Sequence, residues 1–155
     1  MYNKLLIVFF TFSALFAISC SVKEKPINYG HDACDYCQMT IVDDKYGAEI
    51  VNKQGKAFKF DAAECMMRYI THGEISDADI ALTLVTDLTK PGKFVNAKKG
   101  FYLISENLPS PMGAYLSSFE DKKTASDYLE KHGGKLYSWD ELKIYFKSIT
   151  KTHHH

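Results

Sequence analysis

The sequence predicts an α+β fold in which two ββαβ units form one compact domain. Short runs rich in β-branched and aromatic residues, bounded by turn-forming residues, indicate strands. Two longer segments open with a capping residue and end at glycine, which is typical of helices. In each half of the chain two strands precede such a helix and one strand follows it. This order favours mostly antiparallel sheets packed by helices.

Three strands are expected in the first half. The runs 48–51 and 56–60 flank a turn at 52–55 and together predict a hairpin. The run 81–86 consists largely of strong β-formers. Ahead of the hairpin, the β-branched residues 40–42 continue from a cysteine-containing segment.

One helix is expected between these strands, from Asp61 to about residue 72. Asp61 is the predicted N-cap, with Glu64 at the position that completes a capping box. Gly73 is the stop signal. The first half therefore follows the order ββαβ.

The second half repeats this order. Strands are expected at 94–96, 100–105, 114–119 and 135–138, with a proline-rich loop at 109–111. A helix begins at Asp121 or Lys122 and ends before a glycine pair, and a last helix spans 139–149. Sequence identity between the halves is too low to prove a duplication.

The N-terminus carries an export signal. Residues 5–18 are almost continuously apolar and are preceded by Lys4, as in a signal peptide, and the stretch is short for a membrane span. It leads into a small residue followed by Cys20, which resembles a bacterial lipobox. We predict a lipoprotein signal peptide at 1–19 and a lipidated N-terminus and spacer at 20–31, which would anchor the protein on the extracytoplasmic side of a membrane. A simple cleaved signal or an anchor is the alternative.

The rest of the chain is predicted to form one domain, at 32–150, and a histidine-ended tail at 151–155. The tail is either a natural metal-binding tail or a truncated purification tag. The sequence has 19 basic and 19 acidic residues, a formal net charge of zero. No basic surface for nucleic acid is therefore expected.

Three sulfur atoms lie within six residues in the segment Cys34 to Met39. Two thiols, on Cys34 and Cys37, and the thioether of Met39 are soft ligands that favour a soft metal, above all Cu(I). On a strand, Cys37 and Met39 would project from the same face, and a turn could bring Cys34 back to them. His31 and Asp32, just before the motif, are interpreted as exposed spacer residues.

Other chemistries remain open for this cysteine pair, which could close a disulfide, exchange thiols in a redox reaction or form half of a zinc site. A thioredoxin-like motif opens a helix, whereas the β-branched run 40–42 follows here. Zinc prefers four ligands, and only Cys65, His72 and His132 are available to complete such a set. Gln38 stands where haem attachment requires histidine.

Further sulfur-bearing side chains could complete the site. Cys65, Met66 and Met67 follow one another on the first predicted helix, where successive side chains point about 100° apart, so one or two at most can face a metal. The two methionines could equally well be core residues, and Cys65 could be a buried thiol without a metal. Met112 stands between Pro111 and Gly113, which makes it a candidate for lining the site.

Several ordered motifs of the predicted domain are shared with one protein family. They are Asp32 to Ile41, Phe60-Asp61 with Cys65-Met66, Val85 to Asp87, Asn96-Ala97 to Tyr102, Pro111 to Phe119 and Gly133-Gly134. On these motifs the chain resembles the NosL family, membrane-anchored copper-binding accessory proteins of nitrous oxide reductase maturation. It departs from the family pattern at Asn96-Ala97, where relatives often carry an aromatic-Ile-Asp run.

The resemblance implies a Cu(I)-binding metallochaperone and not an enzyme, with two ββαβ units similar to the alkylmercury lyase core. Its implied partners are nitrous oxide reductase and an ABC-type assembly complex. By motif position, the resemblance assigns Cys37 and Met39 to the copper site, and Cys34 next after them. It gives Met112 a role in lining the site. Cys65 and Met66 are possible additional ligands.

Three other functions stay open at this point. A generic copper-trafficking or resistance lipoprotein would use the same site. A thiol redox or organometal-cleaving lipoprotein would use Cys34, Cys37 and Cys65, although no Lys or His within the motif is placed to activate a thiolate. In a purely structural lipoprotein, the motif would form an inert disulfide.

Overall fold

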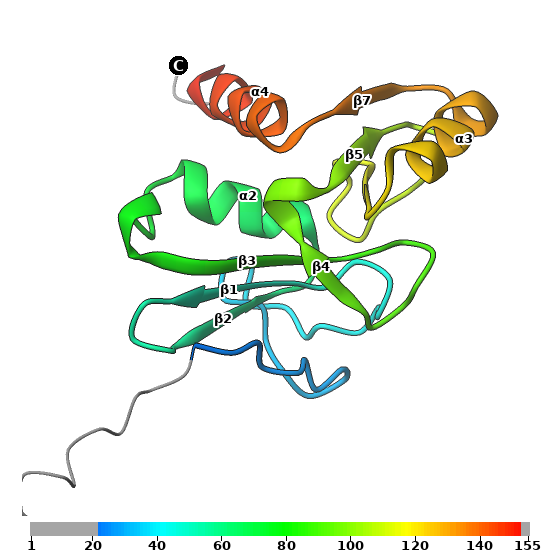
Figure 1. Cartoon of the computed structure of the whole chain (residues 1–155). Coiled ribbons are helices and arrows are strands. Elements are labelled where there is room, and N and C mark those ends of the chain that lie inside the picture. The colour runs from blue at the N-terminus through cyan, green and yellow to red at the C-terminus, as the bar shows by residue number, and fades with distance from the viewer. Residues whose placement is uncertain (1–21, 153–155) are drawn as a thin grey trace, which may run out of the picture.

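Residues 22–152, the part of the chain that this computed structural model describes, form two antiparallel sheets, three α-helices and two short 3-10 helices, Asp77–Asp79 and Ala97–Lys99 (Figure 1). The predicted signal peptide at 1–19, the lipidation site Cys20 and the terminal histidines 153–155 lie outside the described residues. Within the described part, no helix is both long and apolar enough to cross a membrane. The predicted α+β class is confirmed, and the strand pairs described are all antiparallel.

The larger sheet has four strands in the spatial order β2-β1-β3-β4. These are β1 (Ala48–Asn52), β2 (Ala57–Phe60), β3 (Ile80–Thr86) and β4 (Phe94–Asn96), and helix α2 (Ala63–Thr71) connects β2 to β3. The prediction that the strand at 94–96 belongs to the second half is wrong. A turn at 87–93, closed by backbone hydrogen bonds, reverses the chain so that β4 pairs with β3.

The smaller sheet has the order β6-β5-β7. Its strands are β5 (Phe101–Ile104), β6 (Leu116–Phe119) and β7 (Lys135–Tyr137), with helix α3 (Lys122–His132) between β6 and β7 and helix α4 (Trp139–Thr152) at the end. Strands β5, β6 and β7 with α3 form the predicted second ββαβ unit. Helix α4 runs on to Thr152 instead of ending at residue 149.

The helix starts differ between the two units. Asp121 caps α3 as predicted, since its carboxylate accepts a hydrogen bond from the backbone N–H of Thr124 at 2.9 Å. The predicted cap of α2 is wrong. Its N-cap is Ala62, which provides no side-chain cap, and Asp61 lies one residue before it. Glu64 cannot complete a capping box because its carboxylate accepts hydrogen bonds from a distant loop.

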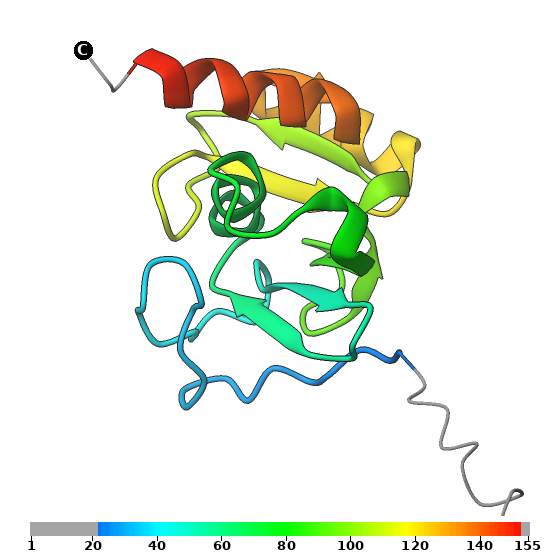
Figure 2. The same ribbon diagram turned by 90° about the vertical axis from the view of Figure 1, so that its left-hand side faces the viewer.

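The main core lies between α2, the larger sheet and α4. Helix α2 covers one face of this sheet, and the N-terminal segment, residues 22–28, runs along the opposite side (Figures 1 and 2). Fully buried side chains fill the space on the α2 side, among them Ile50, Phe60, Met66, Leu142 and Phe146. A smaller cluster of Leu103, Phe119 and Ala125 joins the second sheet to α3. The first turn of α2 is thus held rigidly against the sheet.

Candidate metal centre

The cysteine motif forms a tight loop that is closed at its base. Ala33 and Thr40 form an isolated antiparallel bridge, and the backbone N–H of Cys34 donates to the carbonyl of Met39 at 2.8 Å. Inside the loop, Gln38 donates from its backbone N–H to the Cys34 carbonyl at 2.9 Å and takes a left-handed conformation with φ 63°. Few side chains other than Asn or Asp adopt this conformation readily. The chain therefore reverses within the motif.

This reversal corrects one expectation. Cys37 and Met39 are not on a strand, so period-two alternation does not place their side chains on one face. The Met39 side chain instead stands at the surface with 56% of its area exposed. The β-branched run that follows favours a strand by local propensity, but only Thr40 pairs, in the isolated bridge.

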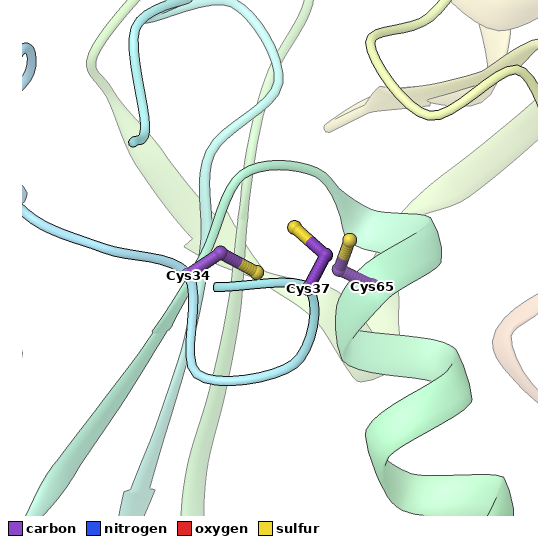
Figure 3. Close-up of side chains that lie close together, drawn as sticks. All are labelled: Cys34, Cys37 and Cys65. Atoms are coloured by element: carbon purple, nitrogen blue, oxygen red, sulfur yellow. The ribbon is translucent and has the colours of Figure 1, made fainter. Parts of the chain in front are cut away.

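Three thiols come together between this loop and helix α2. Cys34 and Cys37 project from the loop and Cys65 from the first turn of α2, with their sulfur atoms facing a common space (Figure 3). All three Sγ atoms lie within 4.8 Å of one another, and none is in a disulfide. Cys34 and Cys65 are buried, whereas Cys37 is partly exposed. A single ion could contact all three sulfur atoms.

The cluster is electrostatically asymmetric. A hydrogen bond from the Cys65 thiol lowers the pKa of Cys34 to about 5, helped by backbone N–H groups of Cys37, Asp61 and Tyr36 and opposed by burial. The same thiol–thiolate hydrogen bond, together with burial, raises the pKa of Cys65. Burial raises the pKa of Cys37. One thiolate is therefore available at neutral pH beside two protonated thiols.

A buried carboxyl group lies next to the thiols. Asp61 is 3% exposed, and its Oδ1 atom has no hydrogen-bond partner. Burial raises its pKa, and the nearby negative charge of Cys34 raises it further. The sequence suggested a helix cap for this residue and gave no signal of its place beside the cluster.

A second buried carboxylate holds the loop that contains Met112. Glu64 accepts hydrogen bonds from the hydroxyl of Ser110, at 3.0 and 2.9 Å, and from the backbone N–H of Met112, at 2.8 Å. A weaker one comes from the backbone N–H of Ala114, at 3.4 Å. Burial raises the pKa of Glu64 despite these contacts. This role of Glu64 was not predicted, because it joins residues more than forty positions apart.

The predicted methionines lie in three different environments. Met39 is at the surface of the motif loop, and Met112 is partly buried against the main core. Met66 is completely buried within that core, together with Met67, so the core interpretation fits its environment. The structure thus brings together Cys34, Cys37 and Cys65, the last of which the sequence suggested only as a possible ligand.

The composition of the cluster restricts its chemistry. Among the described residues, no histidine, carboxylate or further cysteine joins the three thiols as a fourth member of the group. Structural zinc sites are almost always four-coordinate, whereas thiolate ligands select soft ions such as Cu(I). The fold and the cluster together define a small α+β metal-binding protein with a three-thiol site.

Comparison with known proteins identifies the family. Residues 27–145 match the NosL family model, so the chain belongs to the NosL family. The crystal structure of the copper chaperone NosL from Shewanella denitrificans superposes with a TM-score of 0.67 at 25% sequence identity, covering 78% of this chain and 96% of that one. A search of curated proteins found no significant match. The predicted family and fold are confirmed, and the expectation of a binding protein, not an enzyme, agrees with both matches.

Proposed function

We propose that the protein is a Cu(I) metallochaperone that supplies copper to nitrous oxide reductase through its ABC-type assembly complex. The observation that carries this proposal is the cluster of three free thiols within 4.8 Å of one another. Family membership and the solved copper chaperone support copper as the cargo. The predicted lipid on Cys20 would hold the protein on the extracytoplasmic side of a membrane.

The geometry of the cluster suits both holding and passing on a metal ion. Cys34 offers a thiolate before metal arrives, because its pKa is about 5. Cu(I) would then displace protons from Cys37 and Cys65 as it binds. Since Cys34 and Cys65 are buried, exchange would begin at the partly exposed Cys37. The exposed Met39 beside it is a weak neutral donor that could join or leave as an acceptor ligand approaches.

The same asymmetry argues against a thiol redox enzyme. Such enzymes need an accessible thiolate of low pKa. Here the thiol of low pKa, Cys34, is buried, and the accessible one, Cys37, has a raised pKa. A generic copper-trafficking lipoprotein uses the same site, and only the identity of the acceptor separates it from the proposed role.

Copper binding is tested by titrating the reduced protein with Cu(I) against a chromophoric competing chelator. We expect one tightly held Cu(I) per wild-type chain and a large loss of affinity in Cys37→Ser. The matched control is Met67→Leu, a conservative core change that should leave the affinity unchanged. Equal affinity of wild type and Cys37→Ser would contradict the assignment.

Delivery needs a separate experiment. Cu(I)-loaded protein is mixed with copper-free nitrous oxide reductase in the presence of the ABC-type assembly complex, and copper incorporation is followed by the absorption spectrum of the reductase. We expect incorporation from the wild type and little from Cys37→Ser. Equal incorporation from free Cu(I) at the same buffered concentration would leave generic copper trafficking as the function.

A further inference from the structure

Lys59 lies where three segments of the chain meet: strand β2, the N-terminal segment 22–28 and the base of the cysteine loop. Its Nζ atom donates to a carboxylate oxygen of Asp32 at 2.6 Å and to the carbonyl oxygen of Pro26 at 2.8 Å. The Lys59 and Asp32 side chains are 22% and 27% exposed, so this ion pair is partly shielded from water. Such pairs are screened less than surface pairs.

The backbone of Lys59 holds the same loop. Strand β2 is an edge strand, and at Lys59 its outward polar groups pair with Asp35. The N–H of Lys59 donates to the Asp35 carboxylate at 2.6 Å, and the N–H of Asp35 donates to the Lys59 carbonyl at 2.8 Å. One residue of the sheet therefore contacts the loop on both sides of Cys34, at positions 32 and 35.

Asp32 also forms hydrogen bonds that close the loop itself. Its carboxylate accepts a second hydrogen bond from the backbone N–H of Asn28 at 2.7 Å. Its carbonyl oxygen accepts one from the N–H of Ile41 at 2.9 Å, which ties the incoming and outgoing ends of the loop together.

The N-terminal segment is fixed at the same place. The backbone N–H of Lys25 donates to the carboxylate of Glu49 at 2.8 Å, and Glu49 is the cross-strand partner of Lys59. Ile27 is buried in the main core. The segment that leads into the domain from the predicted lipid anchor and the loop that carries two of the three thiols are thus both attached to Lys59.

We propose that Lys59 is a positioning residue for the metal site: its ammonium group, paired with Asp32 and Pro26, holds the cysteine loop so that Cys34 and Cys37 face Cys65 before metal binds. Without it, copper would have to order the loop as it binds, which weakens the net affinity. This role deepens the proposed function and rests on it. Groups that orient metal ligands commonly contribute 10- to 100-fold to metal affinity.

The test measures Cu(I) affinity in the full chain for Lys59→Met, Asp32→Asn, the double variant and Lys59→Arg. Methionine keeps an unbranched chain as far as Cε and both backbone hydrogen bonds but removes the ammonium group. We expect a loss of about 10-fold in Lys59→Met and in Asp32→Asn, no further loss in the double variant, and recovery of most of the affinity in Lys59→Arg. The matched control is Lys90→Met, which removes an ion pair to Glu120 far along the chain and should change nothing.

A copper-free readout separates this role from the proposed function. Phenylarsine oxide binds two close thiols, forming two As–S bonds and releasing its oxygen, with the two thiol protons, as water. We expect its affinity for the apoprotein to fall in Lys59→Met and Asp32→Asn but not in Lys90→Met. This result would support the positioning role even if the wild type failed to bind Cu(I).

Wild-type affinity in Lys59→Met, for either probe, would overturn the positioning role. Additive losses in the double variant would overturn it as well, because they would show that Lys59 and Asp32 act separately. If Lys59→Met does not fold, the affinities of Asp32→Asn for Cu(I) and phenylarsine oxide test the proposal in its place.

Discussion

The two ββαβ units have the same plan, but only the first one, together with the cysteine loop that precedes it, carries the thiols. In each unit the strand before the helix ends in a fully buried phenylalanine, Phe60 in β2 and Phe119 in β6. Each of these pairs with the first residue of the neighbouring strand, Ala48 and Phe101 respectively. The packing plan is therefore common to both units, and the chemistry comes from the few positions that differ.

The largest difference lies at the start of the helices. The third residue of α3 is Thr124, whose backbone N–H and hydroxyl both donate to the capping residue Asp121. The third residue of α2 is Cys65, and the N-cap there, Ala62, has no side chain that could accept a hydrogen bond. The first unit thus has a thiol at the position where the second unit has a threonine that donates to the helix cap.

The residue after each phenylalanine shows the same contrast. Glu120 in the second unit is exposed and forms an ion pair with Lys90 at 2.6 Å. Asp61 in the first unit is buried beside Cys34 and leaves one oxygen without a partner. Buried polar groups without partners reduce stability, and they are concentrated at functional sites. The two units therefore also differ at this position, where the first has a buried carboxyl group next to the thiols and the second an exposed ion pair.

The largest effect expected from this comparison is on copper affinity. Cys65→Ser should lower the affinity for Cu(I) at least 100-fold, about 2.7 kcal/mol, because a hard hydroxyl replaces a soft thiolate. Thr124→Ser, at the same position of the second unit, should leave the affinity unchanged. Competition titrations of both variants measure the difference. Similar affinities in the two variants would show that the helix start is not part of the site.

A smaller effect is expected on stability at the second helix start. Asp121→Ala should reduce the free energy of unfolding, because it removes the N-cap side chain of α3, without changing Cu(I) affinity. Urea denaturation measures the first quantity. A loss of copper affinity in this variant would mean that the two units do not function separately.

The smallest effect concerns the second position of each central strand, Glu49 in β1 and Tyr102 in β5. Both are fully buried, but the hydroxyl of Tyr102 donates to the carbonyl of Ala97, whereas one Glu49 oxygen has no partner. Burial raises the pKa of Glu49 to about 7. The unfolded chain releases this proton near its ordinary pKa of 4.5, so stability falls as the pH rises from there through 7.

The neutral variant Glu49→Gln removes this charge. We expect its thermal midpoint, relative to that of the wild type, to be higher at pH 8 than at pH 5, because only the wild type loses stability as Glu49 ionises. Thermal unfolding at both pH values measures the difference. A larger gain at pH 5 than at pH 8 would contradict the assigned direction of the pKa shift.

Much of the fold could be predicted from local sequence signals. Strand and helix positions follow from β-branched runs, from Asp121 as a cap and from glycine stops, all of which act over a few residues. The pairing of β4 could not, because it depends on how the turn at 87–93 reverses the chain. The cap of α2 was predicted wrongly because the carboxylate of Glu64 bonds instead to a loop more than forty residues away.

The site was predicted in the same uneven way. Cys34 and Cys37 are recognisable by their spacing, and both belong to the cluster. Cys65 could only be suggested, because its approach to the motif depends on tertiary packing. Asp32 was interpreted as an exposed spacer, whereas it is paired with Lys59, and no sequence pattern connects these two residues. Contacts between distant segments are therefore what the sequence alone does not supply.

The central claim is that one Cu(I) ion is held by three thiolates, two from the cysteine loop and one from helix α2. X-ray absorption at the copper edge, on Cu(I)-loaded wild type and Cys65→Ser, tests it most directly. We expect the three sulfur atoms of Cys34, Cys37 and Cys65 around copper in the wild type and one sulfur fewer in the variant. An identical sulfur shell in both proteins would contradict the three-thiol site.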